Sequence, residues 1–98
     1  MFLSVAGFSV GSTNIPSLNM QDAAQGFRTM KASQVGTVTA FPCLLALAAT
    51  WDRSLAHRFA QTLGDEFKAK GANVILGPSV NVHRVGRNGR NAEYLSGE

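Results

Sequence analysis

The sequence predicts an α/β protein with a parallel sheet, because a strand, a long amphipathic helix and a second strand follow one another over short connections. The strands are expected at residues 15–22 and 72–78, and the helix at residues 52–70. The chain has 98 residues, which leaves room for one small domain. Apolar residues make up 45% and charged residues 15%, a balance typical of a globular chain rather than a disordered one.

The first strand is expected to end at Asp22. Apolar residues mostly alternate with polar ones from Ile15 onwards, and the run ends in polar residues. Pro16 has no N–H to donate, so it must stand at the strand start or at an unpaired edge position. Residues 2–10 are interpreted as a loop or an alternative start. No Lys or Arg precedes Arg28, which argues against a secretory signal.

Residues 52–70 are expected to form an amphipathic helix. Its apolar side chains recur at spacings of three and four and define one core-facing stripe, made of Leu55, Ala56, Phe59, Ala60, Leu63 and Phe67. Asp52 or Ser54 can cap the start, and Gly71 supplies the stop. Trp51, directly before the helix, is expected to pack rather than to face a sugar.

The other segments are assigned from their composition. Residues 72–78 are apolar around one Asn and are expected to form a buried parallel strand. Residues 36–41 are a candidate extended piece, whereas residues 44–49 fit either a helical turn or a buried strand. Residues 79–98 are polar and are interpreted as a long loop. In α/β folds, ligands bind where such loops leave the carboxyl ends of strands.

Two groups of residues are candidates for ligand contact. Asp22, at a strand end, can accept hydrogen bonds from ligand hydroxyls, although an ordinary turn Asp is equally compatible with its position. Arg84, Arg87 and Arg90 form the single cluster of basic residues. Three interpretations of this cluster stay open, namely sugar or anion binding, nucleic-acid contact, and ion pairing with Glu residues of the same loop.

Several site classes are excluded by composition. One cysteine and two histidines give neither a disulfide framework nor a zinc spacing, so no metal or cofactor is expected. The phosphate-binding and dinucleotide-binding glycine patterns are absent. No apolar stretch reaches the length of about 18 residues that a membrane-spanning helix needs. The net charge of +3 is too small to indicate nucleic-acid binding by itself, and the compartment is not readable.

Three segments, in this order, resemble motifs of the N-terminal domain of glycoside hydrolase family 3, the β-glucosidase and β-xylosidase family. Residues 15–28 are similar to a strand that ends in Asp-Gly-Pro-x-Gly-x-Arg. Residues 39–52 resemble Thr-x-Phe-Pro followed by Ala-x-Thr-Trp-Asp, and residues 71–98 resemble Gly-Pro-x-x-Asn-x-x-Arg, Gly-Arg-Asn-x-Glu and Ser-x-Glu. The resemblance therefore implies a partial domain at residues 15–98, preceded by an unmatched segment at residues 1–14.

The resemblance implies a fragment of a (β/α)₈ TIM-like barrel, comprising its early βα units only. The family hydrolyses terminal β-linked sugars with retention of configuration. Retention needs a carboxylate nucleophile and an acid/base carboxyl group about 5–5.5 Å apart. Both lie, in the family, beyond the position that matches Glu98. The 98 residues alone are therefore expected to be inactive.

Two positions match sugar-binding residues of the family. Asp22 stands where the family's Asp hydrogen-bonds hydroxyls of the terminal sugar, and Arg90 stands where its sugar-binding Arg lies. Arg84 and Glu93 also match family positions, and we expect them to form a structural ion pair. No residue of this chain is expected to be catalytic.

The chain departs from the family pattern at three positions. Ala23 and Ala24 replace Gly-Pro, and Ala92 replaces an aromatic residue.

The implied partners are a small carbohydrate, such as a β-glucoside or an oligosaccharide, and the remainder of the barrel with the family's second domain. Nucleic acid and membrane are not expected. The alternative to an enzyme fragment is a non-catalytic carbohydrate-binding or partner-binding remnant.

Overall fold

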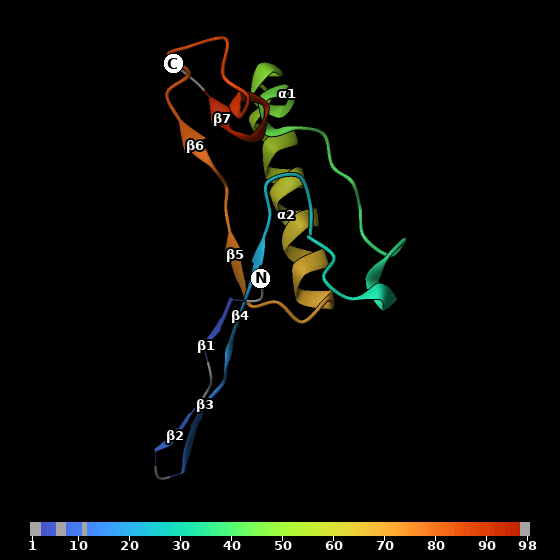
Figure 1. The fold of residues 1–98 in the computed structure, drawn as a ribbon, viewed down its shortest axis with the longest axis vertical. Helices are drawn as coiled ribbons and strands as arrows, with labels where there is room; N and C mark the ends of the chain where they lie inside the picture. Colours follow the sequence, from blue (N-terminus) through green and yellow to red (C-terminus); the bar gives the residue numbers. More distant parts are fainter. Residues whose placement is uncertain (1–2, 6–7, 11, 97–98) are drawn as a thin grey trace.

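The computed structural model describes residues 3–5, 8–10 and 12–96. The elements are β1 (Leu3–Val5), β2 (Phe8–Val10), β3 (Thr13–Ile15), β4 (Leu18–Asp22), the 3₁₀ helix η1 (Ala32–Gln34), α1 (Leu44–Ala49), α2 (Arg53–Ala69), β5 (Val74–Leu76), β6 (Val80–Asn81), the 3₁₀ helix η2 (Asn91–Glu93) and β7 (Leu95–Ser96). Figure 1 shows α2 running beside β4 and β5, while β2 and β3 extend away from this body.

The predicted strand–helix–strand unit is confirmed, and with it the α/β class. β4 ends at Asp22, as predicted, and β5 pairs with it in parallel, with Met20 opposite Val74 and Asp22 opposite Leu76. α2 connects the two strands. Because the strands are parallel, their carboxyl ends lie at the same edge of the sheet, and Asp22 is placed at that edge.

The connection from α2 into β5 is fixed by Asn73, the one polar residue of the predicted strand. Its Oδ1 accepts a hydrogen bond from the backbone N–H of Asn19 at 2.7 Å, and its Nδ2 donates to the carbonyl of Ser17 at 2.9 Å. The backbone N–H of Asn73 donates to the carbonyl of Asn19 at 3.1 Å. The side chain thereby extends the β4–β5 contact by hydrogen bonds that the backbone alone does not make.

The boundaries of α2 follow the predicted capping residues. Asp52 is the N-cap, and its Oδ1 accepts hydrogen bonds from the backbone N–H groups of Ser54 at 2.8 Å and Leu55 at 3.0 Å. These bonds satisfy donors that a helix start leaves unpaired. After the helix, Gly71 adopts a φ of +83°, a conformation that glycine reaches at little cost.

A small apolar core packs against the inner face of α2. It is formed by the buried residues Ala23, Phe27, Leu63, Phe67 and Ala72, with Val38, Phe41 and Phe59 against them. Two edge-to-face aromatic pairs join loops to the helix. Phe27 meets Phe67 with ring centroids 5.1 Å apart, and Phe41 meets Phe59 at 5.0 Å. The predicted stripe of α2 is confirmed at Leu63 and Phe67, whereas Ala60 is exposed.

The interpretation of residues 2–10 as a loop is wrong for the residues described there, 3–5 and 8–10. β1 pairs antiparallel with β4, and β2 pairs antiparallel with β3. Leu3 is opposite Met20 and Phe8 is opposite Ile15, so both pairings belong to one hairpin register. The expected strand at residues 15–22 is interrupted after Ile15 and resumes at Leu18. Pro16 explains this interruption, because it has no N–H to donate to a ladder.

The extended piece expected at residues 36–41 is not a strand. Its backbone is held by groups other than a β-ladder, since Thr39 N–H donates to the carboxylate of Glu66 on α2 at 3.1 Å. Phe41 N–H donates to the carbonyl of Gln25 at 3.0 Å. The ambiguous residues 44–49 form the helix α1, in which Leu44 is buried.

Three expectations about burial and loops are also wrong. β5 is not a buried strand, because Ile75 and Leu76 are each 38% exposed. Trp51 does not pack on α2 but is 82% exposed, with a φ of 53°. Residues 79–98 contain more than loop, since β6 and β7 pair in parallel and η2 lies between them.

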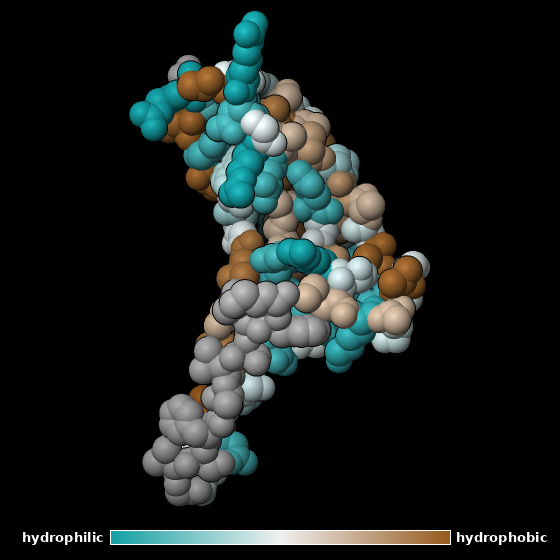
Figure 2. Space-filling view, viewed as in Figure 1, coloured by the Kyte–Doolittle hydropathy of each residue, from teal (hydrophilic) through white to brown (hydrophobic). Residues whose placement is uncertain are grey.

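Apolar residues also reach the surface on the segment that follows β5. Val80, Val82 and Val85 are between 60% and 70% exposed. Figure 2 shows apolar surface at the end of the molecule that carries β6 and β7. Among the described residues, no helix combines the length and the apolar character that crossing a membrane requires.

We expect Gly64→Ala to raise the free energy of unfolding by about 0.5–1 kcal/mol, because glycine in a helix interior is less favourable than alanine by that amount. A Cβ at Gly64 would meet no atom within 4 Å. Gly71 is the matched control, since a Cβ there also meets no atom within 4 Å but φ is +83°. Gly71→Ala should therefore destabilise, and urea unfolding that moves both variants in one direction would contradict this account.

We expect the stabilising effect of the Asp52 cap to be lost in acid. The hydrogen bond from Leu55 N–H, followed by those from Ser54, lowers the pKa of Asp52 in the folded chain. A carboxyl whose folded pKa is lowered contributes stability above its unfolded pKa, and this contribution disappears as the pH falls through the folded pKa. Thermal unfolding, measured from neutral pH down through the folded pKa of Asp52, should show a smaller fall in melting temperature for Asp52→Asn than for the unmodified chain. An equal fall in both proteins would contradict the role of Asp52 as the cap.

Candidate functional site

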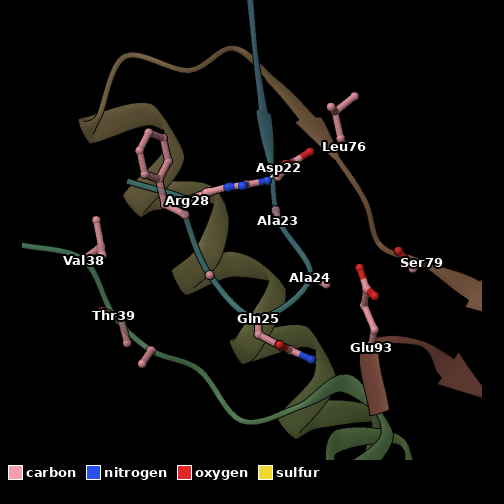
Figure 3. A pocket seen from close by; sticks show the side chains of 13 residues that line it. Asp22, Ala23, Ala24, Gln25, Arg28, Val38, Thr39, Leu76, Ser79 and Glu93 are labelled. Atoms are coloured by element: carbon pink, nitrogen blue, oxygen red, sulfur yellow. Dashed lines mark hydrogen bonds and ion pairs between the residues drawn. The ribbon is translucent and has the colours of Figure 1, made fainter. Parts of the chain in front are cut away.

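A cavity of about 520 Å³ lies beyond the carboxyl ends of β4 and β5. Its lining comes from four parts of the chain that are distant in sequence: residues 22–28, residues 38–40, Leu76 with Ser79, and Glu93. Figure 3 shows these segments surrounding the cavity. Its polar side chains belong to Asp22, Gln25, Arg28, Thr39, Ser79 and Glu93.

The loop after β4 brings Asp22 and Arg28 together. Ala23 and Phe27 form an isolated antiparallel bridge, so the residues on either side of it stand opposite each other. Arg28 Nη1 donates to Asp22 Oδ2 at 2.8 Å, and Figure 3 shows the guanidinium extending to the carboxylate. Cross-strand pairs of opposite charge are favourable in this arrangement. Residues six apart in sequence are therefore paired by the bridge between them.

Close packing on both sides fixes the shape of this loop. Ala23 is 4% and Phe27 is 5% exposed, so both side chains of the bridge are anchored in the core. Gly26 has a φ of +131°, and a Cβ there would lie 2.5 Å from the carbonyl oxygen of Thr39. A Cβ on Gly77 would lie 2.9 Å from the carbonyl oxygen of Ala23. Only glycine allows such close approach at these two positions.

The ion pair orients Asp22 more than it stabilises the chain. The side chains of Arg28 and Asp22 are 64% and 55% exposed, and a pair this exposed contributes about 0–1 kcal/mol. Its geometry matters more for the site, because Oδ2 is engaged by Arg28 while Oδ1 accepts no hydrogen bond from any described residue. Asp22 thus offers a free acceptor at the cavity, beside a guanidinium with further donors.

Glu93 reaches the same cavity from η2. The amide Nε2 of Gln25 donates to the carbonyl of Ala92 at 3.4 Å, which joins the loop after β4 to η2. In Figure 3 the side chain of Glu93 rises from η2 toward Ser79 and Ala24, and all three line the cavity. Ala92, where the family pattern has an aromatic residue, is exposed and contributes its carbonyl instead.

The expected ion pair between Arg84 and Glu93 does not form. Within the described part of the chain, the ion pair between Arg28 and Asp22 is the single one, so Arg84, Arg87 and Arg90 pair with no described carboxylate. Arg84 instead lines a separate cavity of about 480 Å³ with Asn91. The side chain of Asn91 is buried and donates to the carbonyls of Val85 at 2.8 Å and Gly86 at 3.2 Å, which shapes this loop.

Of the two expected sugar-binding residues, one lines this cavity. Asp22 lines the cavity beyond β4 and β5, but Arg90 is not among its lining residues. Arg90 precedes η2, its side chain is exposed, and its backbone N–H donates to Asn88 Oδ1 at 3.1 Å. The role of Arg90 stays a prediction.

Sequence reasoning did not assign Arg28 and Glu93 to the cavity. Arg28 ends the motif that begins at Asp22, and the six-residue spacing between them was the signal that could have assigned Arg28 to the cavity. Glu93 lines the cavity next to a contact between Gln25 and Ala92, two residues that are 67 positions apart. No local pattern in the sequence indicates such a contact.

Comparisons with known proteins agree with the motifs that surround this cavity. The family model described as the glycosyl hydrolase family 3 N terminal domain matches residues 6–97. The match begins before residue 15, the start that the motifs indicated, and it includes all the lining segments of the cavity. No solved structure matches the chain.

Curated relatives carry β-glucosidase names. A probable beta-glucosidase I of Emericella nidulans is 45% identical over 88 residues, which is 90% of this chain and 10% of that protein. A putative beta-glucosidase of Schizosaccharomyces pombe is 42% identical over 83 residues, 85% of this chain and 10% of its own. The chain therefore spans about a tenth of the length of these relatives. On the family match and these identities, the chain belongs to glycosyl hydrolase family 3, within its N-terminal domain.

Proposed function

We propose that this chain is the sugar-binding part of a β-glucosidase-type glycosidase that hydrolyses terminal β-linked sugars with retention. One observation carries the proposal: Asp22 stands at the carboxyl end of a parallel strand, is oriented by Arg28, and has a free carboxylate oxygen at a cavity of about 520 Å³. A ligand of many hydroxyls suits such a site, because a carboxylate accepts and a guanidinium donates hydrogen bonds.

In this proposal Asp22 binds and does not react. A retaining glycosidase needs a free carboxylate to attack the sugar and a protonated carboxyl group to assist the leaving oxygen. A carboxylate oxygen held by a guanidinium at 2.8 Å is a poorer nucleophile than a free one, whereas the second oxygen of Asp22 can accept a hydrogen bond from a sugar hydroxyl. Both catalytic carboxylates are therefore assigned to the part of the longer family members that this chain does not span.

The fold supports a place in the early part of a (β/α)₈ barrel. β4, α2 and β5 form one parallel strand–helix–strand unit, and the cavity lies at the carboxyl ends of its strands. Ligands of such barrels bind at that end. β5 is at one edge of its three-stranded sheet, with Ile75 and Leu76 partly exposed, so a further strand has an edge to pair with.

A second candidate function is a non-catalytic carbohydrate-binding remnant. The observation that favours it is that the cavity gathers six polar side chains, from Asp22 to Glu93, none of which is assigned to catalysis. These side chains can hydrogen-bond a sugar without reacting with it. The two candidates share the same site and differ in the chemistry that follows binding.

We expect the purified chain to bind methyl β-D-glucoside and Asp22→Ala to weaken this binding by about tenfold or more, because hydrogen bonds to a charged group contribute about 1.5–3 kcal/mol. Asp65→Asn is the matched control, since Asp65 is an exposed carboxylate of α2 outside the cavity. Isothermal titration of the three proteins measures the effect. Equal affinities for the unmodified chain and Asp22→Ala would refute the assignment of Asp22.

We expect the 98-residue chain to release no chromophore from an aryl β-D-glucoside, since neither catalytic carboxylate is assigned to it. The absorbance assay should give the same rate with the chain as with buffer. A rate above that of buffer, abolished in Asp22→Ala, would show that this chain holds its own catalytic group.

A further inference from the structure

We infer that Glu93 sets the charge preference of this site: its carboxylate disfavours acidic sugars such as glucuronides and favours sugars that carry an amino group. The inference rests on the proposed function, because it concerns the ligand of the same cavity. It assigns to Glu93 a role that differs from the structural ion pair expected from the sequence.

The geometry places an unpaired carboxylate on the cavity wall. Glu93 lines the cavity, and its carboxylate makes neither a hydrogen bond nor an ion pair with any described residue. Its backbone is held in η2, where its N–H donates to the carbonyl of Arg90 at 3.0 Å. The contact of Gln25 with Ala92 joins this short helix to the opposite wall of the cavity. The position of Glu93 is thus fixed by backbone contacts, while its charge stays available.

The other charges of the cavity do not balance Glu93. Asp22 and Arg28 neutralise each other at 2.8 Å, and the remaining lining residues carry no charge. The cavity therefore has a net charge of about one negative unit, and the Glu93 carboxylate carries this charge. A sugar carboxylate entering the cavity would be repelled, and a sugar ammonium group would be attracted.

The size of the preference follows from the exposure of the site. Glu93 is exposed, so solvent screens its interaction with a ligand charge. We expect a preference of about two- to fivefold for the amino sugar over the neutral sugar, as for an exposed ion pair, and a similar loss for the acidic sugar. Both differences should shrink as salt is added.

The test compares three ligands on three proteins. Isothermal titration measures the binding of methyl β-D-glucoside, its 2-amino-2-deoxy analogue and methyl β-D-glucuronide, at a mildly acidic pH that protonates the amine. The proteins are the unmodified chain, Glu93→Gln, and Asp65→Asn, which removes one negative charge outside the cavity. Thermal unfolding of Glu93→Gln verifies that the variant is folded.

The expected result is a ranking of amino above neutral above acidic sugar in the unmodified chain and in Asp65→Asn, with the differences lost in Glu93→Gln. If Glu93 had a purely structural role, Glu93→Gln would weaken the binding of all three sugars by the same factor and keep their ranking. That result would overturn the inference. Equal affinities of the unmodified chain for all three sugars overturn it as well, but leave the proposed function intact. Binding of none of the three overturns both.

Discussion

The edge-to-face contact between Phe27 and Phe67 is the interaction on which the site depends. It anchors the loop after β4 to the buried face of α2, with ring centroids 5.1 Å apart. Phe27 is also one half of the bridge to Ala23, which places Asp22 opposite Arg28. The charged pair is itself exposed and weak, so its geometry is imposed by the apolar contact beneath it.

The parallel register of β4 and β5 supplies the second requirement. Because Asp22 is opposite Leu76, the residues that follow both strands open toward one cavity. Asn73 aligns the start of β5 with β4, and Glu66 of α2 holds the segment around Thr39 against the same edge. Side chains from distant parts of the sequence are thereby gathered around one space, an arrangement that α/β folds commonly use to bind ligands.

Sequence reasoning predicted the parts of this molecule that follow from local patterns. The spacing of Leu63 and Phe67 with their neighbours gave α2, and the polar stop after Met20 gave the end of β4 at Asp22. The N-terminal hairpin was missed, because strand pairing depends on a partner that is distant in sequence. Pro16 interrupts the strand that was predicted at residues 15–22, and its partners β1 and β2 were not recognised as strands. The exposure of Trp51 also could not be read from its neighbours, since it depends on which elements surround it.

We propose that a sugar binds in one cavity, which the contact of Phe27 with Phe67 anchors. Backbone amide shifts of the isotope-labelled chain, titrated with methyl β-D-glucoside, locate the binding site. We expect the shifts to concentrate at residues 22–28, Thr39, Ser79 and Glu93. Shifts concentrated instead in the apolar groove between α1 and α2, around Leu47 and Leu55, would show that the sugar binds elsewhere.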